Sequence, residues 1–155
     1  MSRSSTSSGI DGALDLSHLL CFELHAASRA MTAVYRPILD HLGLTYPQYL
    51  VMVLLWEREP RTVRELGRAF EFDSGTLSPM LKRLEAAGLL RRRRRAEDER
   101  EVEVTLTDGG RGLQDRAREV PRDIERATGL SGREIEELRG QLAELRSALR
   151  RASAG

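Results

Sequence analysis

Cysteine is almost absent from this sequence, and the signals of several other protein classes are missing too. A single cysteine, Cys21, excludes an internal disulfide framework and any zinc site built from cysteines. The three histidines lie far apart without metal-ligand spacing, so no metal or cofactor is predicted. The longest apolar run covers residues 49–56, whereas a membrane helix needs about 20 residues. Residues 1–12 are rich in serine and glycine and lack the apolar run of a secretory signal. We therefore expect a cytoplasmic protein in a reducing compartment, with no membrane partner.

Neither sign of charge dominates the chain, but its basic residues are concentrated in the middle. The formal net charge is +1. Residues 62–100 carry 10 basic and 7 acidic side chains, and five of the basic ones form the unbroken run Arg91 to Arg95. The 155 residues correspond to one domain. We expect a disordered tail over 1–12 and a single domain over 13–155.

Two helices are predicted before the basic region. Apolar residues at helical spacing begin near Asp15, and Pro37 and Gly43 are expected to end this first helix. Residues 45–48 (Thr-Tyr-Pro-Gln) form a capping box with proline in the first turn. The helix that follows, from Tyr46 to about Glu57, is apolar nearly all round, which predicts a buried core helix.

The basic region is predicted to hold two short helices and a hairpin. A second capping box at 62–65 opens the first of these helices, and Asp73 or Ser74 is expected to cap the other. Gly88 is placed to end that helix. The run from Leu89 into the arginines and the alternating segment 102–106 predict two strands around the polar turn 97–100.

The C-terminal third is predicted to return to helix, interrupted at Pro121 and Gly129. A third capping box at 131–134 precedes leucines and an isoleucine spaced at three and four over 135–149. Such a seam is long enough to pair with another helix, and the alternative is an amphipathic helix packed on its own domain. The predicted order is four helices, a hairpin and two helices.

This order is that of a winged helix-turn-helix protein, mainly α with a small β-hairpin wing. The second short helix is expected to enter the major groove of DNA, and Arg94 and Arg100 of the hairpin to lie beside the duplex. We expect Asp98 to hold the Arg100 guanidinium in position. Pro79 either bends the helix or marks a later start. A merely solvated, charged helix and loop is the alternative interpretation. The helix residues that can bond bases or phosphates are Ser74, Thr76, Ser78, Lys82 and Arg83.

Six stretches of the sequence form a recognisable set. They are Leu-Cys-Phe (20–22), Thr-Tyr-Pro-Gln-Tyr (45–49), Leu-Trp-Glu (55–57), Asp-Ser-Gly-Thr-Leu (73–77), Pro-Met-Leu-Lys-Arg-Leu-Glu (79–85) and Glu-Asp-Glu-Arg (97–100). Together they resemble the MarR family of dimeric winged-helix repressors, and within it the organic-hydroperoxide-resistance regulators of the one-cysteine type. The resemblance runs from residue 20 to about 121.

The resemblance implies a homodimer in which 13–61 and 108–155 supply dimerisation helices and core, and 62–107 the winged helix-turn-helix. Cys21 matches the reactive cysteine, and Tyr35 and Tyr46 match two tyrosines that hydrogen-bond to it. His25 stands where the best-known relatives carry a further tyrosine. The implied partners are a palindromic DNA operator, an organic hydroperoxide and a small cellular thiol. Ser74, Thr76, Pro79 and Arg83 match recognition-helix positions, and Asp98 and Arg100 match the wing pair whose arginine enters the minor groove.

Cys21 itself supports two interpretations, a buried packing residue or a redox sensor. A helix N-terminus and His25, one turn away, both favour the thiolate. Cys21 and Tyr35 are fourteen residues apart, which is roughly 21 Å along a continuous helix. They can touch only if the helix breaks or if the tyrosine comes from a second subunit.

Three other functions stay open at this point. A repressor of the same class can respond to an aromatic ligand in a cleft between its helices, with Cys21 as packing only. A cysteine thiol peroxidase would leave the helix-turn-helix unexplained. A protein-interaction module that uses the leucine seam would show no salt-dependent DNA binding.

Overall fold

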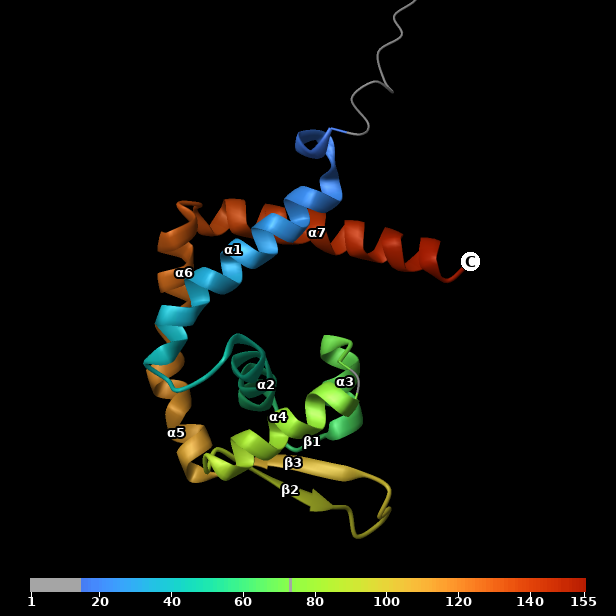
Figure 1. Cartoon of the computed structure of the whole chain (residues 1–155). Helices are drawn as coiled ribbons and strands as arrows, with labels where there is room; N and C mark the ends of the chain where they lie inside the picture. The colour runs from blue at the N-terminus through green and yellow to red at the C-terminus, as the bar shows by residue number, and fades with distance from the viewer. Residues whose placement is uncertain (1–14, 73) are drawn as a thin grey trace, which may run out of the picture.

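The computed structural model describes residues 15–72 and 74–155, and it has the predicted mainly helical fold with a small sheet (Figure 1). The expected tail over 1–12 and the expected cap at Asp73 lie outside these residues. The elements are η1 Leu16–His18, α1 Leu20–Asp40, α2 Tyr46–Glu57, β1 Arg61–Thr62, α3 Val63–Phe70, α4 Ser74–Ala86, β2 Leu90–Arg94, β3 Val102–Leu106, α5 Asp108–Ala117, α6 Val120–Thr128 and α7 Gly132–Ser153.

All three predicted capping boxes are confirmed, and they set the starts of α2, α3 and α7. In each box, the side-chain oxygen of Thr45, Thr62 or Ser131 accepts a hydrogen bond from the backbone N–H three residues later. The glutamine or glutamate at that later position accepts one from the N–H of the capping residue. Two otherwise unpaired donors are satisfied at each helix start.

The end of α4 and the hairpin are also confirmed. Gly88 has a left-handed φ of +75°, and the Leu89 N–H donates to the Leu84 carbonyl at 3.0 Å. This turn directs the chain from α4 into β2. β2 then pairs antiparallel with β3, from Leu90 opposite Leu106 to Arg94 opposite Val102.

Some boundaries differ from the predictions. α1 continues through Pro37 to Asp40, and its start is separated from the 3₁₀ turn η1 by the extended Leu19. α4 begins at Ser74, so Pro79 lies within the helix and does not mark a later start. Pro121 stands in the first turn of α6, so the C-terminal third has three helices rather than two. β1 is a third strand on β3, and at two residues it is too short to leave a pattern in the sequence.

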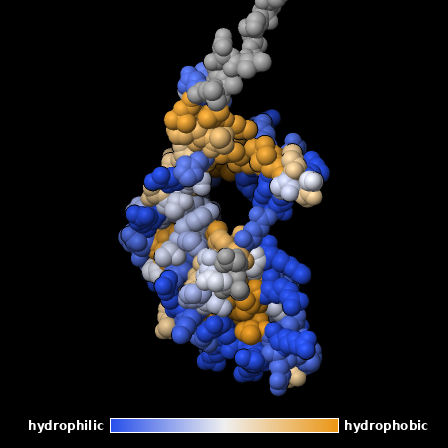
Figure 2. Space-filling model, turned by 45° about the vertical axis from the view of Figure 1, so that its right-hand side comes forward, coloured by the Kyte–Doolittle hydropathy of each residue, from blue (hydrophilic) through white to orange (hydrophobic). Residues whose placement is uncertain are grey.

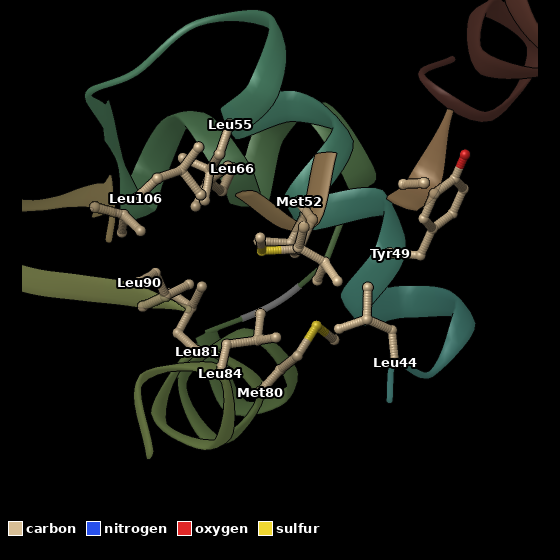
Figure 3. Packing of buried hydrophobic residues seen from close by; sticks show 14 of the residues in the cluster. Leu44, Tyr49, Met52, Leu55, Leu66, Met80, Leu81, Leu84, Leu90 and Leu106 are labelled. Carbon is tan, nitrogen blue, oxygen red and sulfur yellow. The ribbon is translucent and has the colours of Figure 1, made fainter. Parts of the chain in front are cut away.

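α2 is the buried helix, as predicted, and its side chains share one core with those of α3, α4, β2 and β3. Its Val51, Met52 and Leu55 have almost no exposed surface. Figure 3 shows Met52 and Leu55 among Leu66 of α3, Leu81 and Leu84 of α4, and the strand residues Leu90 and Leu106. From the last turn of α2, the Trp56 indole N–H donates to the Gly110 carbonyl of α5 at 2.9 Å.

The N-terminal part of the described chain and the C-terminal helix α7 both keep large apolar residues exposed. α7 has no buried residue, so within the chain it does not bury its leucine seam against its own domain. Figure 1 shows α7 crossing beside the first half of α1, away from the sheet, and Figure 2 shows a hydrophobic patch at the start of α1. The exposed large apolar residues are Leu16, Leu20, Phe22, Met31, Leu138, Leu142 and Leu149.

Gly110 is required where α5 approaches the turn after α4. A Cβ at Gly110 would lie 2.0 Å from the Leu89 backbone oxygen, whereas a Cβ at Gly112 of the same helix meets nothing within 4 Å. We predict that Gly110→Ala destabilises the fold by at least about 1–3 kcal/mol, because the backbone must move. Gly112→Ala is the matched control and should stabilise by up to about 1 kcal/mol through helix propensity. Urea unfolding measures both, and equal free energies of unfolding for the two variants would contradict this account.

Candidate nucleic-acid interface and thiol site

The recognition helix α4 separates its apolar and polar residues as the sequence predicts. Leu77, Leu81 and Leu84 are buried against the core, and Met80 is nearly so. α3 ends at Phe70, and Glu71 adopts a left-handed backbone (φ 57°) that turns the chain toward α4. Ser74 is the first residue of the helix. On α4, the predicted DNA contacts whose side chains are exposed are Thr76, Ser78, Pro79, Lys82 and Arg83.

A groove of about 660 Å³ lies between α3, the first half of α4 and the wing. Its floor is apolar and includes Val63, Phe72 and Leu77. Its lining also includes Ser78 of α4 together with Arg64, Arg68, Arg92 and Arg100. The structure therefore brings Ser78 of the recognition helix and Arg100 of the wing to one surface.

Asp98 shapes the wing turn through the backbone. Its Oδ1 accepts a hydrogen bond from the Arg100 N–H at 3.0 Å, and its carbonyl accepts one from the Glu101 N–H, also at 3.0 Å. The expectation that Asp98 holds the Arg100 guanidinium is therefore wrong in detail. A short aspartate bonds most readily to an N–H two residues on, which is the usual Asx turn. The turn leaves the Arg100 side chain exposed.

The arginine run contains two kinds of side chain, a division that the sequence analysis missed. Arg95 donates to Glu101 and to Glu103, both at 2.7 Å, and these carboxylates raise the pKa of Arg95. Arg92 is paired with Glu85 of α4. Arg91, Arg93 and Arg94 are exposed. The alternation of polar and apolar residues over 102–106 predicts a strand beside the arginines, so a pair between Glu103 and Arg95 could have been expected. The contact between Arg92 and Glu85 depends on the packing of α4 against β2.

Cys21 lies at the N-terminal end of α1 and is exposed as a free thiol. His25 follows one turn later and is exposed as well. α1 runs without a break to Asp40, so the fourteen residues between Cys21 and Tyr35 span roughly 21 Å. Of the two routes that the sequence left open, a broken helix is therefore excluded. Within one chain the thiol does not reach Tyr35.

Tyr35 and Tyr46, in contrast, meet within the chain. Their ring centroids are 4.8 Å apart, although α1 and α2 carry them eleven positions apart in sequence. The ring of Tyr49 also packs here, with its centroid 5.9 Å from that of Tyr35 and 6.5 Å from that of Trp56. Burial, with the neighbouring Tyr49 and Tyr46, raises the pKa of Tyr35 to about 12. The Tyr35 hydroxyl therefore stays protonated near neutral pH and is available as a hydrogen-bond donor. In the sequence, Tyr49 stands in the apolar run 49–56, and nothing there separates it from the core residues around it.

Comparison with known proteins gives a consistent result. Residues 33–117 match the family model described as transcriptional regulator SarA/Rot. The organic hydroperoxide resistance transcriptional regulator of Bacillus subtilis (strain 168) is 46% identical over 136 residues, which are 88% of this chain and 92% of the relative. This chain belongs to the MarR-like family of winged-helix transcriptional regulators. Within that family it falls in the organic-hydroperoxide-resistance branch, as the sequence motifs predicted.

Two solved structures of one relative, AbfR, extend the comparison to a reduced and an overoxidised form. Reduced AbfR bound to DNA has a TM-score of 0.78 and 36% identity, covering 91% of this chain and 96% of that one. Overoxidised AbfR bound to DNA has a TM-score of 0.66 and 39% identity, covering 84% and 95%. Family membership makes this MarR-like chain a regulator rather than a thiol peroxidase. None of its described helices is long and apolar enough to cross a membrane.

Arg100 is the side chain of the MarR-like wing best placed to test DNA contact. We predict that Arg100→Ala weakens binding to a promoter duplex by about 1–3 kcal/mol, because an arginine in a groove contributes roughly that much. Arg126 of α6 is also exposed and serves as the control for lost positive charge. Titration at moderate salt by fluorescence anisotropy measures both. Equal affinities for Arg100→Ala and Arg126→Ala would remove Arg100 from the interface.

Proposed function

We propose that this protein is a homodimeric repressor that binds a palindromic operator when reduced and releases it when Cys21 is oxidised by an organic hydroperoxide. The observation that carries the proposal is the continuity of α1. One unbroken helix keeps the thiol of each chain far from its own Tyr35 and Tyr46, which are packed together. A second copy that crosses the first can bring its tyrosine pair to the thiol and complete two identical sites.

The uncovered apolar faces of α1 and α7 support the dimer. Leu20 is 61% exposed and Leu149 56% exposed within the single chain. Patches of this kind mark protein interfaces, and closed two-fold dimers are the commonest solution. The dimer interface and its core would then be formed by residues 13–61 and 108–155. Residues 62–107 of each chain would form one DNA-reading head, so the dimer would have two. Two-fold symmetry requires half-sites about one DNA turn, or 34 Å, apart.

DNA is the expected partner of the exposed polar face of α4 and of the wing. Recognition-helix residues Ser74, Thr76, Ser78 and Pro79 would lie in the major groove, with Lys82 and Arg83 close to phosphates. Arg94 and Arg100 would follow the adjacent minor groove. Because arginine–phosphate contacts release counterions, affinity should fall steeply as salt rises. This function places the protein in the cytoplasm with the DNA that it binds.

The chemistry at Cys21 begins with the thiolate. Cys21 lies in the first turn of α1 as an exposed free thiol, so a peroxide can reach its sulfur. The sulfur attacks one peroxide oxygen, so an S–O bond forms while the O–O bond breaks. Sulfur is oxidised to a sulfenic acid, and the alkoxide that leaves takes up a proton to become an alcohol. The hydroxyls of the partner's Tyr35 and Tyr46 would orient the thiolate by hydrogen bonding.

The step that releases DNA is expected to be the larger change that follows. With no second cysteine in the chain, a small cellular thiol condenses with the sulfenic acid to give a mixed disulfide and water. AbfR has been solved on DNA in its overoxidised form, so added oxygen atoms alone do not prevent that relative from contacting DNA. The bulk of a mixed disulfide would separate the tyrosines and change the spacing of the two heads. A coupling of about 1–3 kcal/mol changes affinity 5- to 150-fold.

The deciding experiment compares the wild type with Cys21→Ser. Both reduced proteins should bind a palindromic promoter duplex with the same affinity. After equimolar cumene hydroperoxide and then free cysteine, we predict that the wild type loses 5- to 150-fold in affinity while Cys21→Ser keeps its own. Fluorescence anisotropy gives the affinities, and mass spectrometry confirms the adduct on Cys21.

Two results would overturn the redox proposal. If both proteins stay bound, oxidation does not control this protein. If both are released, Cys21 is not the switch. The apolar groove between α3, α4 and the wing, with arginines in its lining, would then favour the alternative of a repressor released by a small aromatic ligand.

A further inference from the structure

Glu85 connects the recognition helix to the wing through three contacts with a single residue. It lies in the last turn of α4, and Arg92 is the third residue of β2. Glu85 Oε1 accepts a hydrogen bond from the Arg92 backbone N–H at 3.2 Å. Glu85 Oε2 accepts one from Arg92 Nε at 3.0 Å and lies 2.9 Å from Arg92 Nη2. We call this set of contacts the Glu85–Arg92 brace.

The brace differs from an ordinary surface ion pair because it includes the backbone of an edge strand. The strand order β1-β3-β2 makes β2 an edge, and the Arg92 N–H points away from β3 toward α4. An unpaired donor on an edge needs an acceptor, and a carboxylate makes stronger hydrogen bonds than a neutral group. The backbone N–H and then the guanidinium of Arg92 hold the pKa of Glu85 below its usual range. Both side chains are about one-third exposed, so solvent reaches the brace although most of its surface is covered by protein.

The brace is located where its geometry matters for reading DNA. Arg92 lines the same groove as Ser78 and Arg100, which belong to the recognition helix and the wing. Glu85 follows Arg83 by two residues on α4. The Arg92 guanidinium therefore lies on the surface that the proposed function turns toward DNA, and the Glu85 carboxylate holds it at 2.9 Å.

We propose that Glu85 is a positioning residue for DNA recognition: it fixes the wing strand to the recognition helix and withholds Arg92 from the phosphate backbone. This inference rests on the proposed DNA-binding function. A fixed wing presents Arg100 at a set distance from the groups on α4, which favours the correct operator. A withheld Arg92 reduces attraction to any sequence, because phosphate contacts carry no sequence information. Glu85 therefore acts on specificity rather than on affinity alone.

The test measures two duplexes with each variant, a promoter operator and a scrambled duplex of the same length. Glu85→Gln removes the charge and keeps one oxygen for the Arg92 N–H. We expect operator affinity to fall about 3- to 10-fold and scrambled-duplex affinity to rise about 2- to 5-fold. The salt dependence for scrambled DNA should steepen by about 1.8 per dimer, because each of the two subunits adds one phosphate contact with a slope of about 0.9. The double variant Glu85→Gln/Arg92→Gln should return scrambled-duplex binding to the wild-type level.

Glu99→Gln in the exposed wing turn is the matched control for charge. It should strengthen binding to both duplexes equally and leave their ratio unchanged. The inference is overturned if Glu85→Gln lowers the melting temperature but keeps the wild-type ratio, which is a purely structural role, or if Glu99→Gln reduces the ratio as much. Failure of the proposed function looks different, since the wild type itself would then show no salt-dependent binding to either duplex.

Discussion

The continuity of α1 is the constraint on which the rest of this account depends. A helix from Leu20 to Asp40 cannot bring its second residue to its sixteenth, so Cys21 and Tyr35 stay about 21 Å apart in each chain. The same helix carries uncovered apolar side chains around the thiol, and near its other end it carries Tyr35, which packs on Tyr46 of α2. Under the proposed function, a chain built this way would carry the sensing pocket in two separate halves. Assembly with a second copy would join the halves and cover the apolar residues at the same time.

In the DNA-reading half of the molecule, an apolar core holds the elements together and carboxylates set the geometry of the wing. Asp98 forms the wing turn through a backbone N–H, and Glu101 and Glu103 hold Arg95 within the wing. Glu85 holds the edge of that wing to α4. Acidic side chains thus divide the basic segment into two groups. Arg92 and Arg95 are paired with carboxylates, and the other arginines are left exposed to solvent. The charge of Arg91 to Arg95 is therefore a poor guide to how many of them contact DNA.

Local signals in the sequence predicted the fold well, and contacts between distant elements escaped them. The capping boxes at Thr45, Thr62 and Ser131 and the glycine at 88 each act within a few residues, so their outcome could be read directly. Strand β1 has no pattern because its two residues are held by β3, and α1 tolerates Pro37 in its last turns. For the site, the recognition-helix face was predictable from helical spacing. The acceptors of Arg92 and Arg95, and the third ring of Tyr49, depend on packing that spacing does not reveal.

Subunit complementation tests the central claim most directly. Two differently tagged chains are mixed, one carrying Cys21→Ser and the other Tyr35→Phe with Tyr46→Phe, and the mixed dimer is isolated through both tags. If each pocket takes its thiol from one chain and its tyrosines from the other, the mixed dimer holds one complete pocket. Its remaining Cys21 should then form sulfenic acid with an organic hydroperoxide at the wild-type rate per thiol. A mixed dimer that reacts no differently from the homodimer lacking both tyrosines would show that the pocket is not shared between chains.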